Sequence, residues 1–299
     1  MKQGPASPAA ATPAHQRGRE SMVPGRSQGV NHYENFPVAS VLCPPRLRPP
    51  IAAIYWFART ADDMADEGDA APETRLNDLA AYRADLMAAA SGLAPSARWA
   101  DVFEALRPVI AQFELPADLL ADLLSAFEQD VVKQRYASQA ELDDYCRRSA
   151  NPVGRLLLHL YGVQDTPSLH MSDCICTALQ LINFWQDLSV DIPRGRIYLP
   201  ADAWVTHGVD EAQLLGLESS PGAINLIAAC ARHARASMLK GSGLVHKVPG
   251  RGGWELRLVV QGGLRILDKM EALRFNTLKQ RPKLGPWDVL VMGWRALWM

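Results

Sequence analysis

Residues 50–69, PIAAIYWFARTADDMADEGD, are the stretch that most constrains how this chain folds. Apolar residues recur three and four positions apart, and Pro50 and Gly68 suit the start and the end of a helix, so the pattern predicts an amphipathic helix. On this helix Asp62 and Asp66 share one face near the C-terminal end, where the helix dipole disfavours anions. Because this arrangement costs stability, it indicates either a solvated acidic helix end or a compensating cation.

A second acidic helix end occurs in residues 172–191, SDCICTALQLINFWQDLSVD, which predict another helix, ended by a proline. Four polar residues fall at spacings of three, four and four and therefore share one face. They are Gln180, Asn183, Asp187 and Asp191. Two helices that each end in an acid pair predict the two halves of one metal site, and the alternative is two unrelated solvated faces. Carboxylate oxygens, with waters and phosphate oxygens, are ligands that Mg²⁺ prefers.

The composition places the chain among all-α globular proteins. Its 299 residues, 48% of them hydrophobic, can form a large core in one or at most two domains. Helical periodicity dominates and alternating strand patterns are scarce, which predicts an all-α fold. The net charge of −1 provides no global field for nucleic acid, so no nucleic-acid partner is expected. Five cysteines without a zinc-binding spacing favour reduced thiols and a cytoplasmic location.

The two ends of the chain differ from its centre. Residues 1–29, rich in Pro, Ala, Gly and Arg, lack the apolar segment of a secretory signal and predict a disordered N-terminal extension. Residues 284–299 form an apolar, tryptophan-rich tail that is too short to span a bilayer. This tail either packs on its own core or makes a peripheral contact with the inner membrane, with aromatic rings at headgroup depth. Residues 30–283 are expected to form one domain.

Three further segments carry candidate site residues. Phe36 and Ser40 either line the mouth of a pocket or serve only in capping and packing. In residues 138–162, the sequence NPVG interrupts an apolar helix and either makes room for a ligand or joins two helices. Arg194 and Arg196 follow the second acid pair across a glycine turn, where guanidinium groups are suited to gripping phosphate oxygens.

Four motifs, in this order, make the chain similar to the squalene/phytoene synthase family of head-to-head prenyl synthases: ARTADDMAD, YCRRSANPVG, LQLINFWQD followed by SVD, and RGRIYLP. The match covers about residues 31–283. The resemblance implies a single-domain isoprenoid synthase helical bundle around a central apolar cavity, with an isoprenoid diphosphate as substrate. It also implies roughly two or three Mg²⁺ ions as cofactors. No nicotinamide cofactor is predicted, because no GxGxxG motif follows a strand.

The resemblance also assigns roles to individual residues. Tyr145 matches a tyrosine that handles a proton during ionisation and rearrangement. Aromatic faces such as those of Phe36, Tyr55 or Trp185 can stabilise a carbocation in a dry cavity. The residues expected to bind magnesium, and to act in catalysis with Tyr145, are Asp62, Asp66, Asp187 and Asp191, with Asp63 adjacent as a further ligand. The candidates for substrate contact, from spacing and resemblance together, are Phe36, Ser40, Tyr55, Arg59, Asn151, Gln180, Asn183, Arg194 and Arg196.

Two departures from the family pattern bear on the reaction. Gln186 stands where many members have arginine, and Asn151 with Pro152 replaces a small glycine-containing step. With the opening NHYENFPVAS, these features are most similar to the bacterial hydroxysqualene synthase branch of hopanoid pathways. Members of that branch convert presqualene diphosphate and water to hydroxysqualene and diphosphate, and other enzymes of the pathway are the implied partners.

Two other readings of the sequence remain open at this point. One is squalene or phytoene synthase chemistry, which starts from two prenyl diphosphates. The other is a non-catalytic protein that binds prenyl lipid or acts as a pathway scaffold. All four motif aspartates are present, which a binding protein would not need, so the sequence favours an Mg²⁺-dependent enzyme.

Overall fold

The computed structural model describes residues 42–299, so the predictions for residues 1–29, for Phe36 and for Ser40 lie outside the described part. Within residues 42–299 the regular elements are helices, and the only strand-like pairing is one isolated bridge between Arg135 and Ile197. This confirms the all-α prediction. None of the helices in this part of the chain is long and apolar enough to cross a membrane.

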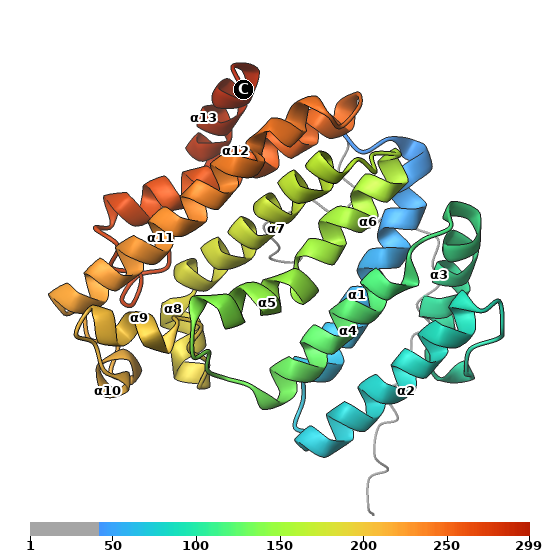
Figure 1. The fold of residues 1–299 in the computed structure, drawn as a ribbon, viewed down its shortest axis with the longest axis horizontal. Coiled ribbons are helices and arrows are strands. Elements are labelled where there is room, and N and C mark those ends of the chain that lie inside the picture. The colour runs from blue at the N-terminus through green and yellow to red at the C-terminus, as the bar shows by residue number, and fades with distance from the viewer. Residues whose placement is uncertain (1–41) are drawn as a thin grey trace, which may run out of the picture. The chain divides into compact units, whose positions relative to one another are not determined.

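The helices follow one another with short connections. In chain order they are η1 (Pro45–Leu47), α1 (Arg48–Asp66), α2 (Pro72–Ala90), η2 (Ala97–Trp99), α3 (Ala100–Phe113), α4 (Ala117–Val132), α5 (Gln139–Ser149), α6 (Asn151–Tyr161), α7 (Thr166–Gln186), α8 (Leu188–Asp191), η3 (Ile192–Arg194), α9 (Ala201–Thr206), α10 (Glu211–Leu215), α11 (Pro221–Gly241), η4 (Ser242–His246), α12 (Arg251–Ala272) and α13 (Pro286–Leu297). Figure 1 shows the long helices side by side, with α13 on the outer side of α12.

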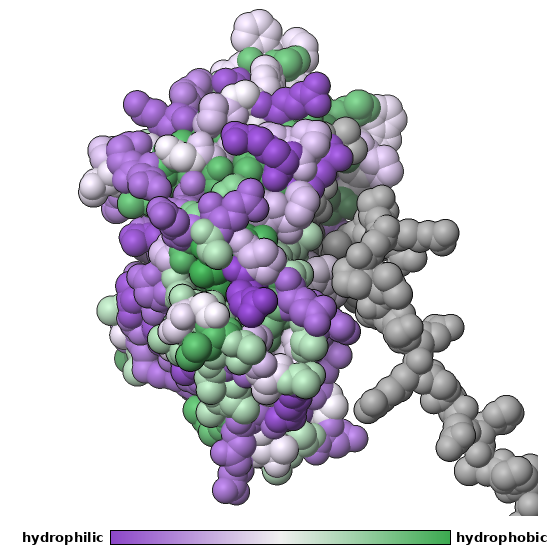
Figure 2. Space-filling view, turned by 90° about the vertical axis from the view of Figure 1, so that its right-hand side faces the viewer, coloured by the Kyte–Doolittle hydropathy of each residue, from purple (hydrophilic) through white to green (hydrophobic). Residues whose placement is uncertain are grey.

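Buried hydrophobic side chains form two clusters. One joins α1, α2, α3 and α4, where the rings of Phe57 and Tyr82 stack at 5.1 Å and Phe103 packs against both. The other joins α7, α11 and α12. Gly241 lets α11 approach α7 closely, because a Cβ there would lie 2.5 Å from the backbone oxygen of Met171. Figure 2 shows one face of the molecule, where hydrophobic and hydrophilic residues are interspersed.

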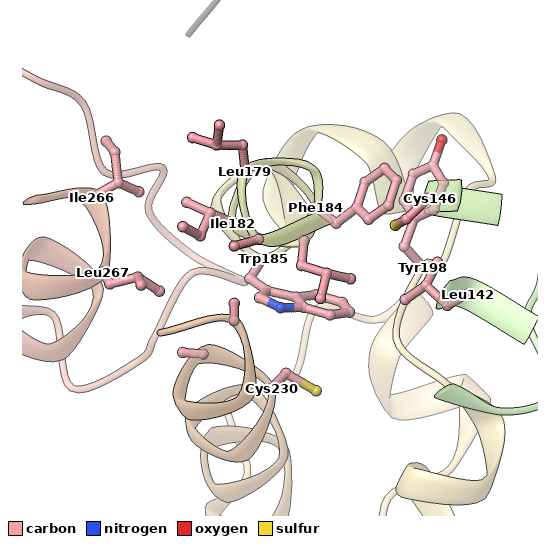
Figure 3. Close-up of a cluster of buried hydrophobic side chains, with 14 of the residues drawn as sticks. Leu142, Cys146, Leu179, Ile182, Phe184, Trp185, Tyr198, Cys230, Ile266 and Leu267 are labelled. Atoms are coloured by element: carbon pink, nitrogen blue, oxygen red, sulfur yellow. The ribbon is translucent and has the colours of Figure 1, made fainter. Parts of the chain in front are cut away.

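Trp185, one of the aromatic residues named for stabilising a carbocation, lies in the second cluster. Its side chain is fully buried, and Figure 3 shows it among core residues that include Ile182, Cys230 and Leu267. Trp185 is therefore a packing residue that fixes α7 against α11 and α12.

One helix boundary differs from the sequence prediction, and a second was left open by the sequence. The helix that carries the second acid pair ends at Gln186, and Asp191 lies in the separate short helix α8. The NPVG segment joins two helices, with Ala150 between α5 and α6. Pro152 lies in the first turn of α6, where a proline costs no hydrogen bond. Of the two alternatives for NPVG, the structure shows the joint between two helices.

Candidate active site

The acidic end of α1 is held by two arginines. Arg59 on α1 itself contacts Asp62 at 3.1 Å and Asp63 at 2.6 Å. Arg196 reaches Asp66 from a segment 130 residues further along the chain, with Nη1 donating to Oδ2 at 2.8 Å and Nη2 to the other oxygen. Within the described residues, the positive charges that pair with this acidic end are guanidinium groups.

The second acidic end is held by an arginine from the loop between α12 and α13. Asp187 follows α7 and accepts hydrogen bonds from Nε and Nη2 of Arg281, the latter at 2.9 Å. Asn183, one turn earlier, donates to Asp187 at 3.3 Å. Buried Gln186 donates to the backbone oxygen of Pro282 at 2.7 Å and so fixes the loop that carries Arg281. Many family members have an arginine at the position of Gln186. Here Gln186 instead positions Arg281 by holding the neighbouring backbone of Pro282.

Arg196 brings the two acidic ends together. Its side chain binds Asp66 of α1, while its backbone N–H donates to the backbone carbonyl oxygen of Asp191 at 3.0 Å. Gly195 has a φ of +86°, a conformation that glycine adopts readily, and this allows the turn before Arg196. Burial and repulsion by Asp187 raise the pKa of Asp191 to about 6, against the opposing charge of nearby arginines. Burial and the neighbouring carboxylate thus make the negative charge of Asp191 unfavourable at this site.

A hydrogen-bonded acid and tyrosine lie beside this cluster. The hydroxyl of Tyr145 on α5 donates to Oδ2 of Asp130 on α4 at 2.8 Å. Burial raises the pKa of Asp130 to about 7, and the charge of Asp66 adds to this, while the hydrogen bond from Tyr145 and the charge of Arg196 oppose it. Burial also raises the pKa of Tyr145 well above its usual value. Asp130 can therefore gain or lose a proton near neutral pH while Tyr145 stays protonated.

Aromatic rings surround this pair. Phe184 of α7 stacks on Tyr198 with ring centroids 3.7 Å apart, and Figure 3 shows these rings at the edge of the second core cluster. Tyr145 lies 5.5 Å from Tyr136 and 6.1 Å from Phe184, measured between ring centroids. All four rings are buried, and their faces carry the negative quadrupole that can stabilise a cation.

The remaining predicted substrate residues are distributed around this cluster. Asn151 accepts a hydrogen bond from Oγ1 of Thr177 at 3.0 Å, which links α6 to α7. Gln180 and Tyr55 are half-buried, one turn before Asn183 on α7 and two turns before Asp62 on α1. Arg194 is exposed, and its charge opposes the raised pKa of Asp191.

Two residues of the cluster were missed by sequence reasoning. Asp130 lies in the sequence SAFEQDVV, where it has no acid partner at helical spacing, so no pattern distinguished it from the solvated acids of α4. Arg281 lies just before the tail and outside all four family motifs. Both reach the site through tertiary packing, and the only sequence signal was their chemical type.

The chemistry of the carboxylates fits a divalent cation. Hard oxygen ligands on two helix ends, with a raised pKa at Asp191, describe a site that a cation would stabilise. Among residues 42–299 no group of three or more His, Cys, Asp and Glu side chains is gathered closely enough to hold a metal ion. Asp62, Asp66 and Asp187 are turned to arginines instead. The donor set fits Mg²⁺, and its assignment as a ligand set stays a prediction.

Comparison with known proteins decides the family. A model described as squalene/phytoene synthase matches residues 30–288. The chain belongs to the squalene/phytoene synthase family. Among the relatives in this family, a hydroxysqualene synthase of Sinorhizobium fredii is 34% identical over 275 residues, which cover 91% of this chain and 90% of the relative. A hydroxysqualene synthase of Zymomonas mobilis is 37% identical over 214 residues, 70% of this chain and 69% of the relative.

A solved structure of the same family shares the fold. Squalene synthase HpnC from Alicyclobacillus acidocaldarius superposes with a TM-score of 0.76 at 36% identity, covering 82% of this chain and 90% of the other. The similarity confirms the prediction of an isoprenoid synthase helical fold. It also confirms that the four motifs were correctly interpreted as a family signature.

Proposed function

We propose that this protein is a hydroxysqualene synthase, which converts presqualene diphosphate and water to hydroxysqualene and diphosphate. The observation that carries the proposal is the meeting of two acidic helix ends at Arg196, beside the Asp130–Tyr145 pair. Support comes from relatives at 32–37% identity that are named hydroxysqualene synthases. An isoprenoid diphosphate is the substrate class that the family as a whole processes.

The charged end of the site is suited to a diphosphate. The residues proposed to hold Mg²⁺ are Asp62, Asp63, Asp66, Asp187 and Asp191. Bound there, Mg²⁺ would supply the positive charge that makes a diphosphate a good leaving group. Arg196 and Arg281, which pair with carboxylates, can turn to the diphosphate oxygens, because their planar donors match phosphate as well as carboxylate. Arg59 lies beside Asp62, and the charge of Arg194 acts on Asp191.

The Asp130–Tyr145 pair is suited to the water step. When the diphosphate leaves with the electrons of the C–O bond, a carbocation remains beside the rings of Phe184 and Tyr198. Water forms a new C–O bond to this cation and must release a proton. The Tyr145 hydroxyl orients the incoming water, and Asp130, whose pKa of about 7 suits a general base, accepts the proton.

The test supplies presqualene diphosphate and Mg²⁺ and measures released diphosphate and a C30 alcohol by mass spectrometry. We expect EDTA, Asp62→Ala and Asp187→Ala each to lower the rate by about two orders of magnitude or more. Asp78→Ala is the matched control, since Asp78 pairs with Arg98 away from the site, and its activity should match the parent protein. Full activity in EDTA or in both site variants would contradict the metal proposal.

Squalene synthesis is the second candidate, because the structural relative at 36% identity is named a squalene synthase. The same assay repeated with NADPH separates the two reactions. Hydride capture gives a C30 hydrocarbon only when NADPH is present, whereas water capture gives the alcohol with or without it. No product from presqualene diphosphate or from two prenyl diphosphates would favour a non-catalytic prenyl-lipid-binding protein.

A further inference from the structure

Helix α13 is attached to the protein by its polar residues. Buried Asp288 binds Arg265 and Lys269 of α12, each at 2.6 Å. Arg295, two turns later, binds Asp268 of α12 at 2.7 Å. An amphipathic helix on a protein surface normally buries its apolar side and shows its charges to solvent. Helix α13 has the opposite orientation.

The outward side of α13 is a continuous apolar stripe. Its members follow one another at helical spacing, and 57% to 79% of each residue is exposed. The α13 stripe consists of Trp287, Leu290, Trp294, Leu297 and Trp298. The rings of Trp294 and Trp298 contact each other edge to face, with centroids 5.8 Å apart. Contiguous exposed apolar surface of this kind marks a contact with another protein or with a membrane.

Basic residues border the α13 stripe. Exposed Lys279 and Lys283 lie in the segment just before the helix. At its other end, Arg257 donates to the backbone oxygen of Ala296 at 3.1 Å and stacks on Trp254, whose ring adds to the exposed aromatic surface. The single acid of α13 is the buried one, so the stripe presents no carboxylate of its own. The surface is therefore aromatic, apolar and flanked by positive charge.

We propose that the α13 stripe docks on the surface of an anionic lipid bilayer without crossing it. Tryptophan combines an apolar ring with a polar N–H, which suits the headgroup region, and leucine enters the boundary of the acyl chains. Lysine and arginine beside such a helix attract anionic headgroups. A second copy of this chain is a poorer occupant, because a symmetric contact would bring like charges together.

The loop that leads into α13 also contacts the candidate active site. Arg281, which binds Asp187, and Pro282, which is held by Gln186, lie in the loop that leads directly into α13. The proposal does not depend on the reaction that the site performs. Lipid binding is measured without substrate, so its failure is distinguishable from a failure of the proposed function.

The test measures cosedimentation of the full chain with vesicles. One set is pure phosphatidylcholine and the other contains about 30% phosphatidylglycerol. We expect binding to the anionic vesicles, weakened several-fold at about 0.5 M salt. Serine at Trp287, Leu290 and Trp294 should lower the partition coefficient at least about tenfold. The matched control has serine at three exposed apolar residues on other helices, Val205, Leu215 and Leu239, and should bind like the parent protein.

A second variant tests the charge contribution separately. Lys279→Gln with Lys283→Gln should remove most of the preference for anionic vesicles, and both side chains are exposed, so folding is preserved. Circular dichroism and thermal melts verify the fold of every variant. Equal loss of binding in the control variant, or no vesicle binding by the parent protein, overturns the proposal. Self-association that the stripe variant abolishes, without vesicle binding, would assign the stripe to a second copy of the chain.

Discussion

Replacing Asp130 by asparagine tests the electrostatics of the candidate site. Asparagine keeps the oxygen that accepts the Tyr145 hydrogen bond but cannot ionise. Burial raises the pKa of Asp130 to about 7 in the folded protein, whereas an aspartate in an unfolded chain has a pKa of about 3.9. Between these values the folded state holds a proton that the unfolded state has released.

The sign of the effect follows from this difference. The stabilisation from the protonated carboxyl is complete below pH 4 or so and is lost as the pH rises through about 7. Between roughly pH 5 and pH 8 the free energy of unfolding of the parent protein should fall by on the order of 2–3 kcal/mol through this residue. Asp130→Asn lacks this contribution, so the difference between the two proteins should change by that amount.

The assay is urea denaturation of both proteins near pH 5 and near pH 8, with EDTA present so that metal binding does not contribute. Asp118→Asn is the matched control, an exposed acid at the start of the same helix, and it should change the free energy of unfolding by no more than about 0.5 kcal/mol. The reasoning would be refuted if the difference in free energy of unfolding between the parent protein and Asp130→Asn changed by less than about 0.5 kcal/mol from pH 5 to pH 8. Asp130 would then already be ionised at pH 5.

Two further predictions concern helix packing. Gly241→Ala should destabilise the protein by about 1–3 kcal/mol in thermal melts, because its Cβ would lie 2.5 Å from the backbone oxygen of Met171. Gly293→Ala, with no atom within 4 Å, should be neutral or stabilising by up to about 1 kcal/mol, and equal effects would contradict the packing argument. Burial opposes ionisation of Asp288, but hydrogen bonds from Lys269, the backbone of Gly285 and Arg265 hold its pKa well below the usual range. Its stabilisation of α13 is therefore present above about pH 4 and lost on acidification below it, so limited proteolysis of the tail should accelerate at low pH in the parent protein, and Asp288→Asn should show fast cleavage at neutral pH as well.

The local features of the site were predictable from the sequence. Helical spacing placed Asp62 with Asp66 on one face of α1, and it placed Asn183 beside Asp187, because these relations depend only on the period of an α-helix. The order of the motifs was sufficient to identify the family. Helical spacing does not say which side of α7 faces the core, so the full burial of Trp185 is known only from the structure.

The contacts between distant residues were decided by the tertiary structure alone. Arg196 and Asp66 are 130 residues apart, and Arg281 and Asp187 are 94 apart, so no periodic pattern relates them. The pKa of Asp130 is raised by burial and by charges on another helix, and the sequence of α4 indicates neither.

The tail shows the same division between local and tertiary information. The sequence determined that residues 284–299 are apolar and rich in tryptophan, but it left open whether they pack on the protein or contact a membrane. The structure resolves this, because α12 presents Arg265 and Lys269 where α13 lies, and an ion pair with Asp288 holds the polar side inward. Sequence fixes the composition of a helix face, whereas the partner that the fold places opposite it decides whether that face is buried or exposed.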